Sequence, residues 1–401
     1  MKMRPPMLFS HDVIISGGGT PGLTLSLLLA QAGMDVALID PSPLSSFKIT
    51  KADGRTSALM QSSIRTLTRA GAWDICAPHG APLEILRIID DSTGGKRQQI
   101  ETDFPSRDIG LEYFGVNMPN NILRAILAMA AVKAKNITLY DGLSLKKFET
   151  DDFGVTIMLS NGKNIRGSVL IGADGRHSPV RETAGIPCWQ HEYGQTAITC
   201  LIEHSGSHDN ISTEFHRPGG PFTLVPMPGN VSSVVWVEKT DDADAFMRMN
   251  KPSFVQSLQD RTCNRLGKTK LVSDPQACPL TALRAQNMVA KRVALIAESA
   301  HVLSPLGAQG LNLSLRDAAS LADILIEAAQ TGLDIGSQAV LKRYERQRRA
   351  DVFLRSAGTD GLTRFVSHNN RPVHELRRAG LKTISMIEPL RLFAMQQGMA
   401  V

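Results

Sequence analysis

The sequence predicts an α/β fold with a Rossmann-like dinucleotide-binding domain, an inserted antiparallel-sheet domain and a C-terminal helical region. Three segments favour this fold class, because each is an apolar run of strand length that ends in a turn and is followed by a helical pattern. Such strand–turn–helix units build parallel sheets. Between residues 185 and 277, strand-like segments separated by Gly and Pro dominate, which indicates an antiparallel sheet.

The first segment combines a strand over residues 12–16, a glycine turn and a helix that begins at once. Gly17, Gly19 and Gly22 have the spacing of a dinucleotide-binding turn, where they permit a tight turn, close approach of a pyrophosphate and close helix packing. Asp40 ends a second predicted strand and stands where a carboxylate usually binds an adenosine ribose. A purely structural turn between strand and helix is the alternative.

The second segment is a predicted strand over residues 168–171 that runs into Asp174 and Gly175, at the strand end where parallel sheets bind ligands. The third is a strand over residues 292–296 that leads to Glu298, a loop rich in Gly and Pro, and a long helix. Glycines let the backbone approach a ligand, and a helix start offers N–H groups to an anion. An ordinary connection or a loop that caps a core helix is the alternative.

Composition excludes several classes of protein. With 42% hydrophobic and 20% charged residues the 401-residue chain is globular, and its net charge of +6 without a dense basic run gives no support for nucleic-acid binding. The five cysteines are scattered without C-x-x-C spacing and the histidines lack metal-ligand spacing, so we expect no disulfide framework and no metal site. We expect a cytoplasmic protein without a signal peptide or membrane span.

Two further segments carry structural expectations. Apolar residues over 58–70 recur at helical spacing, so we expect a helix there. Residues 371–391 interleave basic and apolar side chains, which is typical of a helix that lies on an anionic membrane or docks on a partner. A helix packed on its own protein is the alternative interpretation of this C-terminal stretch.

The three segments together resemble the class A flavoprotein monooxygenases, and the whole chain from about residue 12 to 398 resembles the UbiH/UbiF/VisC family of ubiquinone-biosynthesis hydroxylases. The resemblance rests on the glycine turn, residues 53–59, the Asp-Gly turn, residues 307–313 and the tail at 359–365. It implies FAD as cofactor, with residues 1–75, 105–182 and 278–350 as the FAD-binding domain. Residues 76–104 and 183–277 would then form the substrate-binding sheet domain, and 351–401 the helical region.

The resemblance also implies roles for individual residues. Pro305, Gly307 and Gln309 would line the flavin ring, Glu298 would hold the ribityl chain, and Arg55 and Arg124 would contact the ribityl–pyrophosphate side. No protein side chain is expected to act as catalyst, because the flavin carries the chemistry. The full set expected to bind the cofactor is Gly17, Gly19, Thr20, Pro21, Gly22, Asp40, Arg55, Arg124, Asp174, Gly175, Glu298, Pro305, Gly307, Ala308, Gln309, Gly310, Leu311 and Asn312.

The implied activity is hydroxylation of a polyprenylated phenol in ubiquinone biosynthesis, with NADPH or NADH as transient electron donor and a flavin hydroperoxide as oxygen carrier. Other ubiquinone-biosynthesis proteins are expected as partners, and the inner face of a membrane as a place of peripheral attachment. The chain departs from the family at Ala297-Glu298, where Gly-Asp is usual. The alternatives are a reductase or halogenase on the same scaffold, or a catalytically silent FAD-binding subunit; the W-x-W-x-I-P signature of halogenases is missing.

Overall fold

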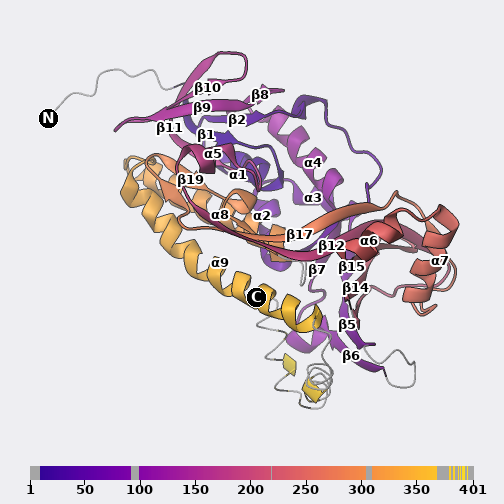
Figure 1. Cartoon of the computed structure of the whole chain (residues 1–401). Coiled ribbons are helices and arrows are strands. Elements are labelled where there is room, and N and C mark those ends of the chain that lie inside the picture. The colour runs from indigo at the N-terminus through magenta and orange to yellow at the C-terminus, as the bar shows by residue number, and fades with distance from the viewer. Residues whose placement is uncertain are drawn as a thin grey trace.

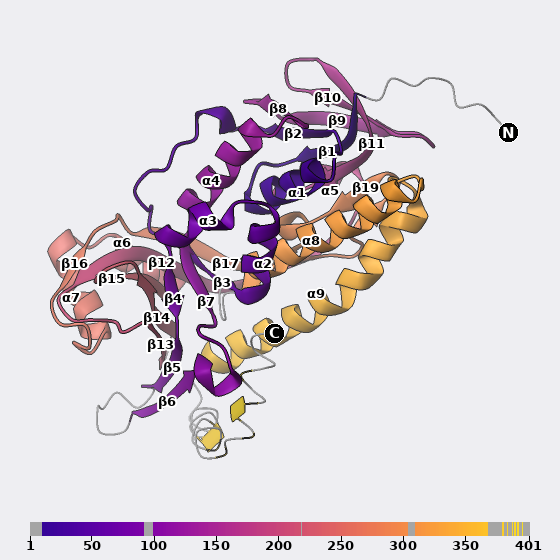
Figure 2. The same cartoon turned by 180° about the vertical axis from the view of Figure 1, so that it is seen from behind.

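The computed structural model describes residues 10–91, 99–217, 219–303 and 309–367, and residues 379, 380, 383, 387, 389, 391, 392 and 395 of the C-terminal stretch. Its elements fall into two large sheets, a small sheet between them and helices on the outside (Figures 1 and 2). This arrangement confirms the fold class expected from the sequence.

The first sheet has the order β18-β19-β11-β1-β2-β8, and its central neighbours from β19 to β8 are parallel. Its inner strands are apolar on both faces, because helices cover them, and β2 is buried throughout. Its strands are β1 (His11–Ser16), β2 (Val36–Asp40), β8 (Ile137–Asp141), β9 (Leu145–Thr150), β10 (Val155–Leu159), β11 (Asn164–Gly172), β18 (Val289–Ala290) and β19 (Val293–Leu295).

Helices pack beside this sheet and against one another. α1 contacts both α4 and α8, and α9 runs along α8 on the outside of the molecule (Figure 1). The helices of this half are α1 (Thr20–Gln31), α2 (Gln61–Arg69), α3 (Trp73–Cys76), α4 (Asn120–Lys133), α5 (Pro179–Thr183), α8 (Gln309–Gln330) and α9 (Gln338–Ser367). Short 3-10 turns are η1 (Leu44–Ser46), η2 (Ala77–His79), η4 (Ser106–Ile109) and η5 (Ala297–Ser299).

The second sheet has the order β20-β17-β12-β15-β14-β13-β5-β6, with β16 beside β12, and is antiparallel except between β13 and β5. Trp236 and Phe222 centre its own apolar core, which α6 (Thr240–Met247) and α7 (Lys251–Arg261) help to close. The strands are β5 (Ile85–Asp90), β6 (Ile100–Pro105), β12 (Cys188–His204), β13 (Ile211–Arg217), β14 (Gly220–Met227), β15 (Val231–Lys239), β16 (Thr269–Leu271), β17 (Gln276–Ala285) and β20 (His301–Val302).

β17 changes the expected boundary between the two parts. It pairs with β12 across residues 276–285, so the strand belongs to the second sheet, whereas a boundary at 277/278 would assign most of it to the FAD-binding part. The remaining division stays a proposal.

The small sheet joins the two parts and corrects one expectation. β3 (Thr56–Met60) pairs with β7 (Gly115–Pro119), which also pairs with β4 (Ala81–Leu83). The helix expected over 58–70 is therefore wrong in its first turn, since Ala58 and Leu59 lie in β3 and helix α2 starts at Gln61. Ladder pairing with a distant strand decides this, and the spacing of apolar residues did not reveal it.

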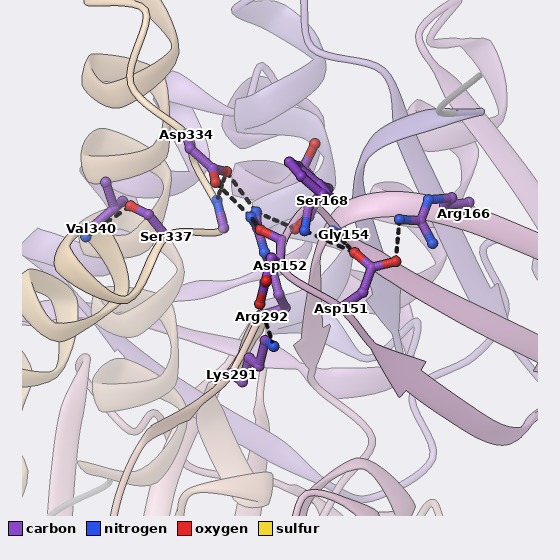
Figure 3. A network of polar contacts seen from close by, with 12 residues as sticks. Asp151, Asp152, Gly154, Arg166, Ser168, Lys291, Arg292, Asp334, Ser337 and Val340 are labelled. Atoms are coloured by element: carbon purple, nitrogen blue, oxygen red, sulfur yellow. Dashed lines mark hydrogen bonds and ion pairs between the residues drawn. The ribbon is translucent and has the colours of Figure 1, made fainter. Parts of the chain in front are cut away.

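Arg292 ties the first sheet to the turn between α8 and α9 (Figure 3). Its guanidinium donates to both carboxylate oxygens of Asp334, each at 2.6 Å, and to the carbonyls of Ser168 and Asp152. Neighbouring Lys291 pairs with the Asp152 carboxylate at 2.7 Å. This charge-assisted network fixes the start of β19, the strand that leads to η5.

Most of the basic stretch 371–391 lies outside the described residues. Of the positions that are described near it, Arg391 pairs with Asp108 at 3.0 Å, and Met395 is buried against Phe104 and Phe114. These contacts are those of a segment packed on its own protein. No helix in the described part of the chain is long and apolar enough to cross a membrane.

Candidate cofactor site

The glycine turn between β1 and α1 is shaped by close backbone packing. Gly17 has a φ of +111°, and a Cβ on it would lie 2.2 Å from the carbonyl oxygen of Ala173. A Cβ on Gly22 would lie 2.0 Å from the Gly17 carbonyl oxygen. Both positions therefore require glycine to fold this turn, and the contact with Ala173 places the Asp-Gly turn directly beside it.

Gly19 differs from its two neighbours, because packing does not require glycine there. A Cβ on it would meet only Pro21 Cδ, at 3.8 Å, and its φ of −72° is open to any residue. Gly19 is also the N-cap of α1, Thr20 and Pro21 open the helix, and no side chain caps its N–H groups. The first turn is thus a cradle with room beside Gly19 at the positive end of the helix dipole, which suits a pyrophosphate.

Asp40 and Arg124 meet at this cradle. The buried Asp40 carboxylate accepts N–H groups of Gly18 at 2.5 Å and Ser42 at 2.7 Å, and Arg124 Nη2 lies 3.3 Å from it. Arg124 Nε donates to the Gly18 carbonyl at 2.8 Å. Asp40 therefore has a structural role that the sequence did not reveal, and its bond to a ribose hydroxyl stays a prediction.

Arg55 lies at the start of β3, with a different environment. Its side chain is 59% exposed and pairs with Asp53 at 3.6 Å, while its carbonyl accepts the N–H of Asn120, the first residue of α4. Its cofactor contact stays a prediction.

The Asp-Gly turn follows β11. Asp174 accepts hydrogen bonds from the Ser178 hydroxyl and from the Val180 N–H, the latter at 3.1 Å, so it anchors the start of α5. Burial raises the pKa of the Asp174 carboxyl above its ordinary value. Gly175 has a φ of +84°, and a Cβ on it would meet nothing within 4 Å, so its side is open.

Glu298 lies in η5, half exposed, and Arg176 of the Asp-Gly turn reaches it with 3.7 Å between Arg176 Nε and Glu298 Oε2. The second and third segments therefore meet as expected, but through an arginine that sequence reasoning missed. Ala297 has a φ of +59°, a region that favours glycine. Its N–H must be held in place for Glu298 to keep its direction.

A buried charge cluster provides that support. Asp317 is fully buried in α8 and accepts the Ala297 N–H at 3.0 Å, His301 Nε2 at 2.6 Å and Arg348 Nε at 2.8 Å. Burial raises the pKa of the Asp317 carboxyl, but contact with His301 and Arg348 outweighs it, so the net pKa lies below its ordinary value. The sequence analysis did not predict this cluster, because Ala297, Asp317 and Arg348 come from separate segments of the chain.

The cluster extends along α9 to the start of α8. Asp351 accepts Arg348 Nη1 at 2.8 Å and Arg355 Nε at 2.7 Å, and Arg316 lies 3.2 Å away. Burial and the nearby Arg355 lower the pKa of Arg316 to about 10. Arg355 Nη1 in turn donates to Gln309 Oε1 at 2.8 Å, so α9 positions a side chain expected to line the flavin.

The start of α8 holds the remaining expected residues. Asn312 is buried and joins α8 to β3: its Oδ1 accepts the Met60 N–H at 2.8 Å and the Ser63 hydroxyl at 2.6 Å, and its Nδ2 donates to the Ala58 carbonyl. A Cβ on Gly310 would meet nothing within 4 Å. Leu311 is half-buried beside the core of the first sheet. Pro305, Gly307 and Ala308 lie outside the described residues.

The chain is similar to known proteins along its whole length. Residues 10–353 match the family model described as FAD binding domain. Ubiquinone hydroxylase UbiL of Rhodospirillum rubrum is 35% identical over 393 residues, which cover 97% of this chain and 89% of the relative. The chain belongs to the UbiH/UbiF/VisC family of FAD-dependent monooxygenases.

Two further similarities agree with this family. The 3-demethoxyubiquinol 3-hydroxylase of Escherichia coli is 30% identical over 373 residues, 92% of this chain and 93% of that protein. A variant of HpxO from Klebsiella pneumoniae, solved with FAD, has the same fold with a TM-score of 0.75 at 18% identity, covering 97% of this chain and 98% of that one. This family member is thus a FAD-binding enzyme.

The geometry fits FAD. A Cβ would have room in the cradle at Gly19, which lies at the N-terminus of α1 and has Arg124 beside it, so these residues would hold the pyrophosphate. Bound FAD supplies the oxygen chemistry. The protein supplies position and charge through η5 and the start of α8. Among the described residues no cluster of His, Cys, Asp or Glu could hold a metal ion.

Proposed function

We propose that this enzyme inserts one oxygen atom from O₂ into a polyprenylated phenol on the path to ubiquinone. The observation that carries the proposal is similarity over nearly the whole chain to proteins named ubiquinone hydroxylase and 3-demethoxyubiquinol 3-hydroxylase. The reductase, halogenase and silent-subunit alternatives are not favoured by these relatives. NADPH or NADH would reduce the flavin transiently, because a single dinucleotide-binding turn is found in the sequence.

Different segments of the chain would bind different parts of FAD. The Gly19 cradle, with Arg124 and Asp40, would hold the pyrophosphate and adenosine end of FAD. Glu298 would accept a hydrogen bond from the ribityl chain, and Gln309, held by Arg355, would stand at the ring. The second sheet would cover the ring and exclude water, since its strand β15 contacts β3 through the hydroxyls of Thr56 and Ser233, 2.9 Å apart.

Deleting the gene in its host and identifying the accumulated quinone intermediate by mass spectrometry tests the proposal. A precursor that lacks one ring hydroxyl is expected, and it names both substrate and ring position. Complementation with the wild-type gene should restore the quinone pool. An unchanged pool in the deletion strain would remove the assignment to ubiquinone biosynthesis, as would a purified chain that takes up no FAD.

We further propose that the enzyme works at the inner face of a membrane together with other ubiquinone-biosynthesis proteins. The argument is chemical: a polyprenylated substrate resides in the bilayer, so the enzyme would meet it at the membrane surface or receive it from a partner protein. Fractionation of host cells should place part of the protein with membranes, released by salt.

A further inference from the structure

The outward side of α9 changes character along its length. Its first half exposes arginines, and its second half exposes apolar and small side chains. Phe353 is 57% and Leu354 72% exposed, and these are among the most exposed large apolar residues of the described chain. From Arg343 to Gly358, the exposed positions are Arg343, Arg346, Gln347, Arg349, Ala350, Phe353, Leu354, Ala357 and Gly358.

The start of β12 continues this face. Trp189 is 47% exposed and forms a row with His191 and Tyr193, with ring centroids 5.8 and 5.0 Å apart. Arg284 pairs across the strands with Trp189 and places its guanidinium 5.3 Å from the centroid of the Phe353 ring. The strand and the helix therefore form one surface, which we call the α9 face: Trp189, Arg284, Arg346, Arg349, Phe353 and Leu354.

The α9 face borders a groove that reaches the chain segment before α8. Two adjoining cavities of about 830 and 220 Å³ share Trp189 and Arg284 as lining residues. The larger one is also lined by Arg346, Arg349 and Phe353, and the smaller one reaches Leu303, which precedes the residues expected to line the flavin.

The charge of this face is positive, because the acidic side chains of α9 beside it are already engaged. Glu345 is buried, with Lys342 Nζ and the Met288 N–H as partners at 2.6 and 2.8 Å. Asp351 is surrounded by three arginines, and Asp360 accepts the Tyr193 hydroxyl at 2.8 Å. The arginines of the α9 face thus remain to meet an anion outside the protein.

We propose that the α9 face docks on an anionic lipid bilayer. Trp189, Phe353 and Leu354 would enter the interface, and Arg346 and Arg349 would meet lipid phosphates, the arrangement that peripheral proteins use. Phe353 and Leu354 are exposed apolar side chains, and fluid lipid can pack around them without a preformed pocket. The role of this docking rests on the proposed function, since a groove that opens at the bilayer would let a lipophilic phenol enter the protein without crossing water.

Vesicle sedimentation with the full-length, FAD-loaded protein tests this docking. Wild type should bind vesicles of phosphatidylcholine mixed with phosphatidylglycerol and bind pure phosphatidylcholine much less. Phe353→Ser with Leu354→Ser should weaken partition at least about tenfold. Arg346→Gln with Arg349→Gln should weaken it about 30-fold on the anionic vesicles only, at about one decade or less per charge.

Matched controls keep the result specific. Phe153→Ser removes the same side chain, 54% exposed, from the β9–β10 hairpin, and Lys146→Gln with Lys147→Gln removes the same charge from β9. Both controls should bind like wild type. Flavin absorbance and circular dichroism of every variant confirm that it is folded.

Three outcomes would overturn the proposal: wild type that stays in the supernatant, α9-face variants that sediment like wild type, or controls that lose binding equally. A dimer in ultracentrifugation that Phe353→Ser with Leu354→Ser abolishes, without vesicle binding, would assign the face to a second copy instead. The readout requires no substrate, so failure of the proposed hydroxylation leaves it interpretable, and the reverse also holds.

Discussion

Glu298 is the residue at which this chain departs from its family, so its role is a sharp test of the site. Its carboxylate lies on η5 beside Arg176 and is half exposed. Glu298→Ala should weaken FAD binding about tenfold, since a hydrogen bond from the ribityl chain to a charged acceptor is lost. Fluorescence titration of the apoprotein with FAD measures this. Glu149→Ala, at a side chain 82% exposed on β9, is the control and should bind FAD like wild type. Equal affinity in both variants would contradict the role of Glu298.

The Asp317 carboxylate accepts the Ala297 N–H of η5, and its charge should contribute to the stability of the fold. Asp317→Asn leaves His301 and Arg348 buried with a weaker partner, which should cost about 3 kcal/mol in the free energy of unfolding. Asp323 lies on α8 like Asp317, and it forms an exposed ion pair with Arg69 of α2. Asp323→Asn breaks this pair and should cost less than about 1 kcal/mol. Urea denaturation measures both. A loss at Asp317 no larger than at Asp323 would refute the supporting role.

The pH dependence of the same variant has a definite sign. Because the pKa of Asp317 is lower in the folded chain than in the unfolded one, the unfolded chain takes up the proton first on acidification. The stabilisation of the folded state by the charged Asp317 carboxylate is therefore complete above the unfolded pKa of about 4, and it is lost as the pH falls through the folded pKa. Denaturation followed from pH ~6 downwards should show a shallower acid limb for Asp317→Asn than for wild type.

Residues that act through local spacing could be predicted from the sequence, and residues that act through distant contacts could not. The Gly17, Gly19 and Gly22 spacing and the acid of β2 were visible as a motif, because all of them serve one turn. The engagement of Asp40 by Gly18 and Arg124 was not visible. Nor was the pairing of Arg176 with Glu298, because such pairs depend on how two turns face each other in the fold.

At the scale of elements, the turn before α1 separates folding from cofactor binding. A Cβ on Gly19 has room in the protein, so Gly19→Ala should leave the stability of the apoprotein within about 0.5 kcal/mol of wild type. The added methyl would occupy the pyrophosphate cradle, so FAD affinity should fall at least about tenfold. Thermal melts without FAD and titration with FAD give the two values.

Gly22→Ala is the matched comparison on the same turn. Its Cβ would lie 2.0 Å from a backbone oxygen, so the turn must shift, at a cost of about 2 kcal/mol or more in unfolding free energy. This variant should therefore lose both stability and FAD. A Gly19→Ala protein that keeps its FAD affinity would move the pyrophosphate away from the α1 start.

Helices and strands whose apolar residues recur with one clear period could be predicted, whereas short strands that depend on pairing could not. The helix of α1 and the strands β1 and β2 follow from apolar runs bounded by glycine. β3 carries an apolar pattern that continues into α2, and only its ladder with β7 makes it a strand. The expected division of domains failed at β17 for the same reason, since pairing with β12 is a contact between distant segments.

At the scale of the whole molecule, we propose that the second sheet closes over the flavin, and Gly54 lies at the joint between that sheet and β3. Its φ is +102°, and a Cβ on it would lie 2.8 Å from Ser273 Oγ, which cannot yield easily because it accepts the Leu201 N–H at 2.9 Å. The neighbouring Asp53 carbonyl accepts Gln276 Nε2 at 2.5 Å, so the segment before β3 is bonded to β17. Pushing this joint open would admit water to the ring.

Gly54→Ala should therefore uncouple the enzyme without removing its cofactor. We expect FAD content like wild type, a stability loss of about 1 kcal/mol from the positive φ, and more hydrogen peroxide released per hydroxylated product, because exclusion of water prevents that side reaction. Gly162→Ala carries the same strain, with a φ of +84° in the β10–β11 hairpin and nothing within 4 Å of its Cβ. It should lose similar stability yet keep the wild-type ratio of peroxide to product. Equal ratios in the two variants would show that the joint at Gly54 does not control water at the flavin, and the second sheet would then need another closing contact.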